Sequence, residues 1–483
     1  MSFIYLDNKI NLKKIFLYGG DDNESITILL PVLVIVIVCI LISIFYFIFS
    51  SKSIYNIITS SQPNIIVSSQ PIINNDVINY NLIDNGVNNI TYNNGENIGF
   101  NSALVSKSTE WDNTKGIFTA SSDGFYLINA SFFINGKTAG ARIALIVNNK
   151  LRYIIIESNA ITAETLRTYS KVEQLNKGDI LSFKVTSGNG FTVFFGSDIG
   201  SHSNITITKL NINNYYSLND NGVNNITYNN GENIGFNSAL VSKSSEWDNT
   251  KGIFTASSDG VYLINASFFI NGKTAGTRIA LIVNNKLRYV VIEANAITTE
   301  TLRTYSKVEQ LNKGDILSFK VTSGNGFTVF FGSDIGSHSN ITITKLNINN
   351  YYSLNDNGVN NITYNNGENI GFNSALVSKS SEWDNAKGIF TASSDGVYLI
   401  NASFFINGKT AGTRIALMVN NKLRYVIIEA NAITAETLRT YSKVEQLSKG
   451  DTLTFKVTSG NGFTVFFGSD IGSHSNITFT RLI

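Results

Sequence analysis

The sequence predicts an all-β protein in which three tandem β-sandwich domains follow one N-terminal transmembrane helix. Three observations lead to this fold class. An uncharged apolar stretch lies near the N-terminus, and a unit of 136 residues then occurs three times. Within each unit, short apolar segments are separated by turn residues, as is typical of a sandwich. The 483 residues also leave room for about three domains of ordinary size.

Composition excludes several classes of protein. The 43% hydrophobic content excludes a largely disordered chain, and 37 basic against 35 acidic residues give no electrostatic basis for binding nucleic acid. A single cysteine, Cys39, excludes a disulfide scaffold and a thiolate zinc site. Asparagine is very abundant, which indicates an AT-rich genome, and a giant DNA virus is one candidate source.

Residues 26–50 carry no charge and are long enough to cross a hydrocarbon core of about 30 Å. A cleaved signal peptide is the competing interpretation, but the apolar run is too long and starts too late. Three lysines precede the stretch and only Lys52 follows it closely. We therefore expect a single-pass protein that contacts lipid through residues 26–50, with residues 1–25 as a cytoplasmic tail and the repeats outside. The membrane would belong to a host cell or, for a viral protein, to the virion surface.

Residues 51–80 are rich in Ser, Asn and Ile without sustained periodicity, and they predict an extended stalk. The repeats follow at 81–214, 215–350 and 351–483. Equivalent residues recur at a constant step, as in Trp111, Trp247 and Trp383. A unit of this length is a complete domain and not a solenoid repeat.

Each repeat predicts antiparallel strands. Asn148-Asn149 suits a tight hairpin, and only 160–172 could form a helix, against which its threonines argue. The strands expected in the first repeat are 115–121, 125–134, 142–147, 151–156, 180–186, 191–195 and 204–210.

The two faces of segment 125–134 are both apolar in part. One face carries Tyr126, Ile128, Ala130, Phe132 and Ile134, which suits a core. The other is not a normal solvated face. We expect it to be buried against another repeat, although a local shift of register or covering loops would also hide it. The residues predicted at this interface are Phe125, Leu127, Phe133 and Phe194.

Several short sequence motifs of the first repeat resemble those of the globular C1q domain, a branch of the C1q/tumour-necrosis-factor superfamily. They are Trp111-Asp112, KGIFTA at 115–120, GFYLINA at 124–130 and LNKGDIL at 175–181, and they recur in the other two repeats. The resemblance implies a ten-stranded jelly roll that forms tight trimers and binds ligands through loops, without enzymatic activity. Many superfamily members are membrane proteins with a stalk, which agrees with the predicted anchor.

The sequence departs from that family in two places. It has no Gly-X-Y collagen stem, and Ser203-Asn204-Ile205-Thr206 replaces the usual Phe-Ser-Gly near the last strand. Calcium-binding positions cannot be matched residue by residue. We expect no cofactor, with calcium bound by oxygen-rich turns as the open alternative.

Few residues of the sequence are candidates for metal binding or catalysis. His202, His338 and His474 are equivalent, so a threefold arrangement could bring them together around zinc, although solvated loop histidines are the simpler interpretation. Asp198, Ser201 and His202 are too close in one loop to suggest a catalytic triad. Glu157, Glu164, Glu173 and Asp179 show no acid–base spacing, and Arg142, Arg152 and Arg167 offer them ordinary ion-pair partners. We therefore predict no catalytic residues.

Sequons recur in every repeat and predict a glycoprotein if the chain enters a secretory pathway. The candidate acceptors are Asn89, Asn204, Asn225, Asn340, Asn361 and Asn476. Asn129 also lies in a sequon, but on the face expected to be buried, so we predict that it is unmodified.

Three copies in one chain can close on each other as an intramolecular pseudo-trimer, or three chains can form stacked trimers. The 12-residue link from Leu210 to Gly222 reaches about 40 Å when extended, which suffices for closure within one chain. The favoured function is a membrane-anchored trimeric binding ectodomain for a receptor, glycan or other surface protein. The alternative is a structural surface or virion-envelope component without a discrete ligand.

Overall fold

The computed structural model describes only part of the chain. The described residues are 79–83, 89–100, 102–105, 110–136, 140–158, 165–195, 203–212, 214–219, 225–236, 238–241, 246–272, 276–294, 301–331, 339–348, 351–355, 361–372, 374–377, 382–408, 412–430, 437–467 and 475–482. The predicted tail, anchor and nearly all of the stalk lie outside them. Among the described residues, none belongs to a helix that is long and apolar enough to cross a membrane.

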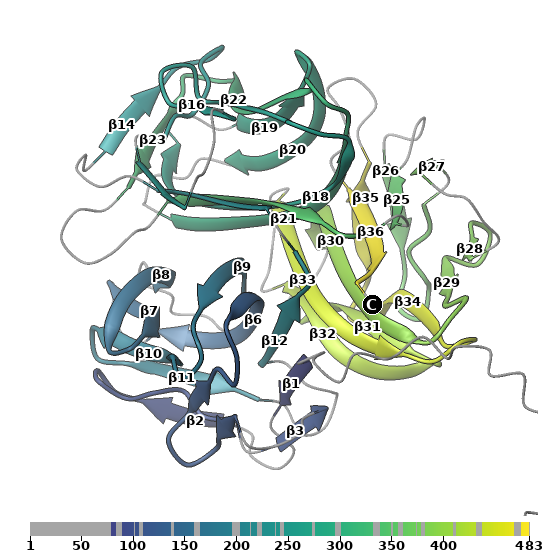
Figure 1. Ribbon diagram of the computed structural model, residues 1–483. Helices are drawn as coiled ribbons and strands as arrows, with labels where there is room; N and C mark the ends of the chain where they lie inside the picture. The colour runs from purple at the N-terminus through teal and green to yellow at the C-terminus, as the bar shows by residue number, and fades with distance from the viewer. Residues whose placement is uncertain are drawn as a thin grey trace, which may run out of the picture. The chain divides into compact units, whose positions relative to one another are not determined.

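Each repeat is built from twelve strands in its described part, and the same order occurs three times (Figure 1). In repeat 1 the strands are β1 (Asn79–Ile83), β2 (Asn89–Tyr92), β3 (Ser102–Val105), β4 (Trp111–Asp112), β5 (Ile117–Thr119), β6 (Gly124–Gly136), β7 (Ala141–Val147), β8 (Lys150–Ser158), β9 (Thr165–Leu175), β10 (Ile180–Ser187), β11 (Phe191–Phe194) and β12 (Asn204–Leu210).

Repeats 2 and 3 contain the equivalent strands. In repeat 2 they are β13 (Asn214–Asn219), β14 (Asn225–Tyr228), β15 (Ser238–Val241), β16 (Trp247–Asp248), β17 (Ile253–Thr255), β18 (Gly260–Gly272), β19 (Thr277–Val283), β20 (Lys286–Ala294), β21 (Thr301–Leu311), β22 (Ile316–Ser323), β23 (Phe327–Phe330) and β24 (Asn340–Leu346). In repeat 3 they are β25 (Tyr351–Asn355), β26 (Asn361–Tyr364), β27 (Ser374–Val377), β28 (Trp383–Asp384), β29 (Ile389–Thr391), β30 (Gly396–Gly408), β31 (Thr413–Val419), β32 (Lys422–Ala430), β33 (Thr437–Leu447), β34 (Thr452–Ser459), β35 (Phe463–Phe466) and β36 (Asn476–Arg481).

Two antiparallel sheets form each sandwich. In repeat 1 the larger sheet has the order β2-β11-β6-β12-β1-β3, with β9 paired to the other side of β6, and the smaller sheet has the order β4-β5-β10-β7-β8. The predicted all-β sandwich is therefore confirmed. The resemblance implied ten strands, and the described part of each repeat contains twelve, several of them only two to four residues long.

The core of each repeat lies between its two sheets. The predicted inward face of β6 is confirmed, because Tyr126, Ile128, Ala130, Phe132 and Ile134 all belong to the buried core cluster of repeat 1. Phe191, Val193 and Phe195 point into the same cluster. Repeats 2 and 3 have separate, equivalent clusters, so each repeat is a domain with its own core.

Segment 160–172 does not form a helix in its described part. From Thr165 onward it is strand β9, which pairs with β6 along its whole length, from Ile134↔Thr165 to Gly124↔Leu175. The β-branched Thr165 and Thr168 favour this extended conformation. Strand β9 pairs on one side only, so it forms an edge of the larger sheet.

The predicted Asn-Asn hairpin is confirmed in all three repeats. Asn148 and Asn149 have φ of 50° and 61°, and Asn284 and Asn285 have 51° and 61°. Both central residues of this tight turn are left-handed, which suits the twist of the flanking strands and which asparagine tolerates better than most residues.

We expect Asn285→Val to lower the free energy of unfolding by about 1–2 kcal/mol, because a β-branched side chain is strained at positive φ. Asn285→Gly should be nearly neutral. Urea denaturation of the two variants checks this. A loss of similar size in both variants would mean that the asparagine side chain, and not its backbone conformation, carries the effect.

Candidate functional site

The edge strands of the three larger sheets bring the repeats together. Strand β9 contacts β18, β21 contacts β30, and β33 contacts β6, while β9, β21 and β33 also contact one another. The order of these contacts is cyclic, from repeat 1 to 2, 2 to 3 and 3 to 1. The three strands therefore surround an approximate threefold axis within one chain (Figure 1).

One apolar cluster joins all three repeats along this axis. We name it the three-repeat cluster, and its buried members are Leu127, Val172, Leu210, Ile212, Tyr215, Val261, Leu263, Val308, Leu346, Tyr351, Val397, Leu399 and Val444. Leu127, Leu263 and Leu399 occupy equivalent positions on the outer faces of β6, β18 and β30, and all three are fully buried. The outward apolar face read from the sequence is thus covered by the neighbouring repeats.

A belt of polar hydrogen bonds lies beside this cluster. Ser170 Oγ donates to Asn265 Oδ1, Ser306 Oγ to Asn401 Oδ1, and Ser442 Oγ to Asn129 Oδ1, each at 3.0 Å. Every bond joins one repeat to the next. Because buried polar groups are costly without partners, these pairs favour one relative position of the repeats over slipped ones.

Buried lysines provide a second set of equivalent bonds. Lys171 Nζ donates to Asn340 Oδ1 at 2.8 Å, and Lys307 Nζ donates to Asn476 Oδ1 at the same distance. Lys443 Nζ closes the cycle on Asn204 Oδ1 at 2.7 Å. All three ammonium groups also lie over the ring of a tyrosine in the same repeat, 4.2–4.6 Å from its centroid.

Burial lowers the pKa of all three lysines to about 7. A glutamate two residues further along each strand opposes this shift in the lysine pKa. Burial raises the pKa of Glu173 and of Glu309, while Arg152 Nη2 lies 3.1 Å from Glu173 Oε1 and Arg288 Nε lies 3.3 Å from Glu309 Oε1. The interface between repeats therefore holds titratable groups whose charge is sensitive to pH near neutrality.

The predicted interface residues divide into two groups. Leu127 lies in the three-repeat cluster, and Phe125 packs against it, with its ring centroid 5.2 Å from that of Tyr215 in repeat 2. Phe133 is buried and Phe194 is half-buried, and their rings pack on each other within repeat 1 at 5.5 Å. Contact of Phe133 and Phe194 with another repeat stays a prediction.

The residues considered for metal binding or catalysis fall partly outside the described part of the chain. His202, His338 and His474 lie there, as do Asp198, Ser201 and Glu164. In the described segments, no group of three or more His, Cys, Asp or Glu residues could hold a metal ion. The calcium and zinc alternatives stay untested predictions.

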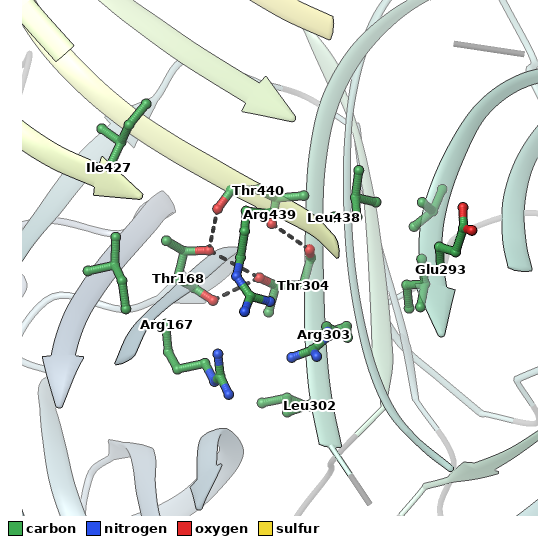
Figure 2. A pocket seen from close by; sticks show the side chains of 13 residues that line it. Arg167, Thr168, Glu293, Leu302, Arg303, Thr304, Ile427, Leu438, Arg439 and Thr440 are labelled. Atoms are coloured by element: carbon green, nitrogen blue, oxygen red, sulfur yellow. Dashed lines mark hydrogen bonds between the residues drawn. The ribbon is translucent and has the colours of Figure 1, made fainter. Parts of the chain in front are cut away.

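The described acidic candidates have structural partners. Glu157 Oε2 lies 2.9 Å from Arg142 Nε, and Asp179 Oδ1 accepts a hydrogen bond from Asn148 Nδ2 at 2.7 Å. Arg142 and Arg152 are ion-pair partners, as expected. Arg167 lines the same small cavity as Arg303 and Arg439 (Figure 2), a grouping that sequence reasoning missed. The three arginines occupy equivalent positions of the three repeats, so a threefold arrangement of the repeats would have predicted that they lie together.

The sequons occupy two kinds of position. Asn89, Asn225 and Asn361 are exposed. Asn204, Asn340 and Asn476 are only 1% exposed, and each accepts the lysine bond from another repeat. A glycan cannot be attached to these three amides in the folded chain without breaking the interface, so we expect these three sequons to carry no glycan.

If the chain passes through a secretory pathway, we expect glycans at Asn89, Asn225 and Asn361 and none at Asn129 or Asn204. Asn129 is 1% exposed and accepts the bond from Ser442, which leaves no space for a sugar. Peptide mass spectrometry after enzymatic removal of glycans in heavy-oxygen water checks this. A sugar at Asn129 would contradict the packed interface.

Comparison with known protein families agrees with this architecture. The family profile described as the C1q domain matches residues 86–199, 221–335 and 357–480. The chain belongs to the C1q domain family. Its three C1q domains correspond to the three repeats, and domains of this family typically form trimers that bind protein or glycan ligands. The family is generally non-enzymatic, and absence of activity in this chain stays a prediction.

Several solved structures are similar to parts of the chain. The globular domain of zebrafish complement 1qA protein shares 14% identity, covers 28% of this chain and 98% of its own, and has a TM-score of 0.23. A triple jelly roll from an archaeal virus turret shares 10% identity, with 83% and 91% coverage and a TM-score of 0.18. A structure from Sulfolobus turreted icosahedral virus shares 12% identity, with 83% and 86% coverage and a TM-score of 0.19. A search of curated proteins finds no match.

Proposed function

We propose that this chain is a membrane-anchored surface protein whose three C1q domains form one trimeric head that binds a receptor, a glycan or another surface protein. Membership of a family in which ligand recognition is common supports the binding role. The uncharged residues 26–50 support the anchor, with the head outside.

The observation that carries this proposal is the cyclic set of contacts between repeats. The same serine–asparagine and lysine–asparagine bonds hold each repeat against the next. Three nearly identical domains held by equivalent bonds present three equivalent outer surfaces to the surroundings. A ligand displayed in several copies on a cell or particle would engage them together, and a weak contact per domain would then give strong overall attachment.

The test uses the full-length chain in lipid nanodiscs. We expect saturable binding to intact cells or to one class of glycan on a panel, with at least tenfold weaker attachment when one domain is released from the head by Leu263→Asp. The exposed substitution Ile316→Asp is the matched control and should bind as the wild type does. A flat response with every cell type and glycan would contradict the proposal and favour a structural surface component.

A further inference from the structure

Each lysine–asparagine pair between the repeats holds an amine against a side-chain amide where water is excluded. Lys171 is 0% exposed and Asn340 is 1% exposed, and Lys171 Nζ lies 2.8 Å from Asn340 Oδ1. Because a C=O bond is about 1.2 Å long, the amide carbon of Asn340 lies within about 4 Å of the amine nitrogen. Groups that are held this close in a fixed position react far faster than the same groups free in solution.

The other two pairs repeat this arrangement. Lys307 Nζ lies 2.8 Å from Asn476 Oδ1, and Lys443 Nζ lies 2.7 Å from Asn204 Oδ1. These four side chains are also at most 1% exposed. Each pair joins a different two of the three repeats, so the pairs form a closed cycle. The arrangement is therefore a property of the interface between repeats and not of one place in it.

The surroundings of Lys171 favour its reactive form. An amine attacks a carbonyl carbon only after it has lost its extra proton. Burial lowers the pKa of Lys171 to about 7, an effect that Glu173 opposes and Arg152 increases. The ring of Tyr153 covers the amine, with its centroid 4.2 Å from Nζ. At pH 8 most of the Lys171 amine is therefore neutral, whereas a lysine in water is almost fully protonated.

Glu173 is an acidic group beside this pair. Lys171 and Glu173 are two positions apart on β9, so their side chains leave the same face of the strand. Glu173 is 3% exposed, and burial raises its pKa, while Arg152 Nη2, 3.1 Å from Glu173 Oε1, lowers it. A carboxyl group in such surroundings can take a proton from an amine and return it to a leaving nitrogen. Glu309 and Glu445 occupy the equivalent positions.

We propose that the three pairs form isopeptide bonds in the folded chain. The Lys171 nitrogen attacks the amide carbon of Asn340, and the new C–N bond replaces the bond to the amide nitrogen, which leaves as ammonia. The attacking amine loses one proton and the leaving nitrogen gains one, through Glu173, so the step needs no oxidant or cofactor. Three such bonds tie the three repeats into a covalent ring. The proposal is independent of the ligand-binding function proposed above.

The test is the intact mass of the full-length chain, which is folded and then incubated at pH 8 for two weeks. Each bond releases one ammonia, so we expect the mass to fall by about 17 Da three times, about 51 Da in all. Freshly folded chain keeps its full mass, and its lysines still titrate as amines. At pH 5, where the lysines are protonated, the loss should be at least tenfold slower. Fragmentation after digestion should identify a branched peptide that joins Lys171 to Asn340.

Variants locate the reacting groups. Lys171→Met should remove one of the three losses and leave the other two. Glu173→Gln should slow the same loss at least tenfold, because the carboxyl group that moves the proton is gone. The matched control is Lys150→Met, which removes an exposed lysine of the same repeat and should keep all three losses.

Three outcomes would overturn the proposal. The first is an unchanged mass after incubation at pH 8. The second is a loss of ammonia found only in unbranched peptides, as when an asparagine cyclises on its own backbone. The third is the same loss in the wild type and in Lys171→Met. The branched peptide is sought in the wild type, so this part of the test holds even if Lys171→Met fails to fold.

Discussion

Replacing Leu263 by aspartate should open the trimeric head. Leu263 is fully buried in the three-repeat cluster, where side chains of all three domains surround it. Truncating a buried leucine to alanine costs about 2–5 kcal/mol, and a carboxylate at this position adds the cost of an unpaired buried charge. We expect the free energy of unfolding to fall by more than this range and the domains to separate, because the carboxylate would replace an apolar side chain that is fully buried among apolar side chains of all three domains.

Urea denaturation of the full-length protein measures this effect. The matched control is Ile316→Asp in the same repeat, since Ile316 is 41% exposed and lies away from the cluster. Its stability should change by no more than about 0.5 kcal/mol. A loss of similar size in both variants would show that the acidic substitution itself, and not its place between the domains, is responsible.

The stability of the head should rise with pH between about 7 and 9. Lys171, Lys307 and Lys443 have folded-state pKa values near 7, while an unfolded lysine titrates near 10.5. Between these values the unfolded chain binds protons that the folded chain does not, so the free energy of unfolding increases as pH rises. The upper limit is about 1.4 kcal/mol per pH unit for each lysine.

Buried glutamate and tyrosine side chains also contribute to the dependence of stability on pH. Burial raises the pKa of Glu309, so this carboxyl contributes stability that is lost as pH rises from 4.5 through its folded value. Burial also raises the pKa of Tyr289, so at high pH the unfolded chain loses protons that the folded chain keeps, and stability falls. The contribution of the lysines is therefore measured as the difference between the wild type and lysine variants that keep Glu309 and Tyr289.

Urea titrations at several pH values test this dependence. Changing all three buried lysines to methionine should flatten the profile between pH 7 and 9. Changing the exposed Lys150, Lys286 and Lys422 to methionine is the control and should leave the slope intact. A flat profile in the wild type would mean that the buried lysines keep their charge in the folded protein.

Much of the fold follows from local pattern. The alternation along 125–134 correctly separates core from outer face, because successive side chains of a strand point to opposite sides. The Asn-Asn dipeptide correctly places a tight hairpin, because both positions need left-handed backbone. The apolar outer face correctly predicts contact between repeats, because apolar side chains such as Leu127 are stabilised when another repeat covers them.

The chemistry between the repeats could not be predicted in the same way. Ser170 and Asn265 are 95 positions apart, and Lys171 and Asn340 are 169 apart, so nothing local in the sequence pairs them. Asn129 and Ser131 are buried, as their place on the outer face of β6 predicts, but the bond that Asn129 accepts from Ser442, 313 positions away, does not follow from that pattern. The grouping of the three equivalent arginines is visible only when three copies of one edge strand meet on an axis, which depends on how whole domains pack.

One chain closes its own three C1q domains into a single head through the contacts of β9, β21 and β33. Multi-angle light scattering of residues 76–483, which form one compact unit without the predicted anchor, tests it most directly. Closure within the chain predicts the mass of one polypeptide, unchanged over a hundredfold range of concentration. A mass of three polypeptides, or one that falls on dilution, would contradict it.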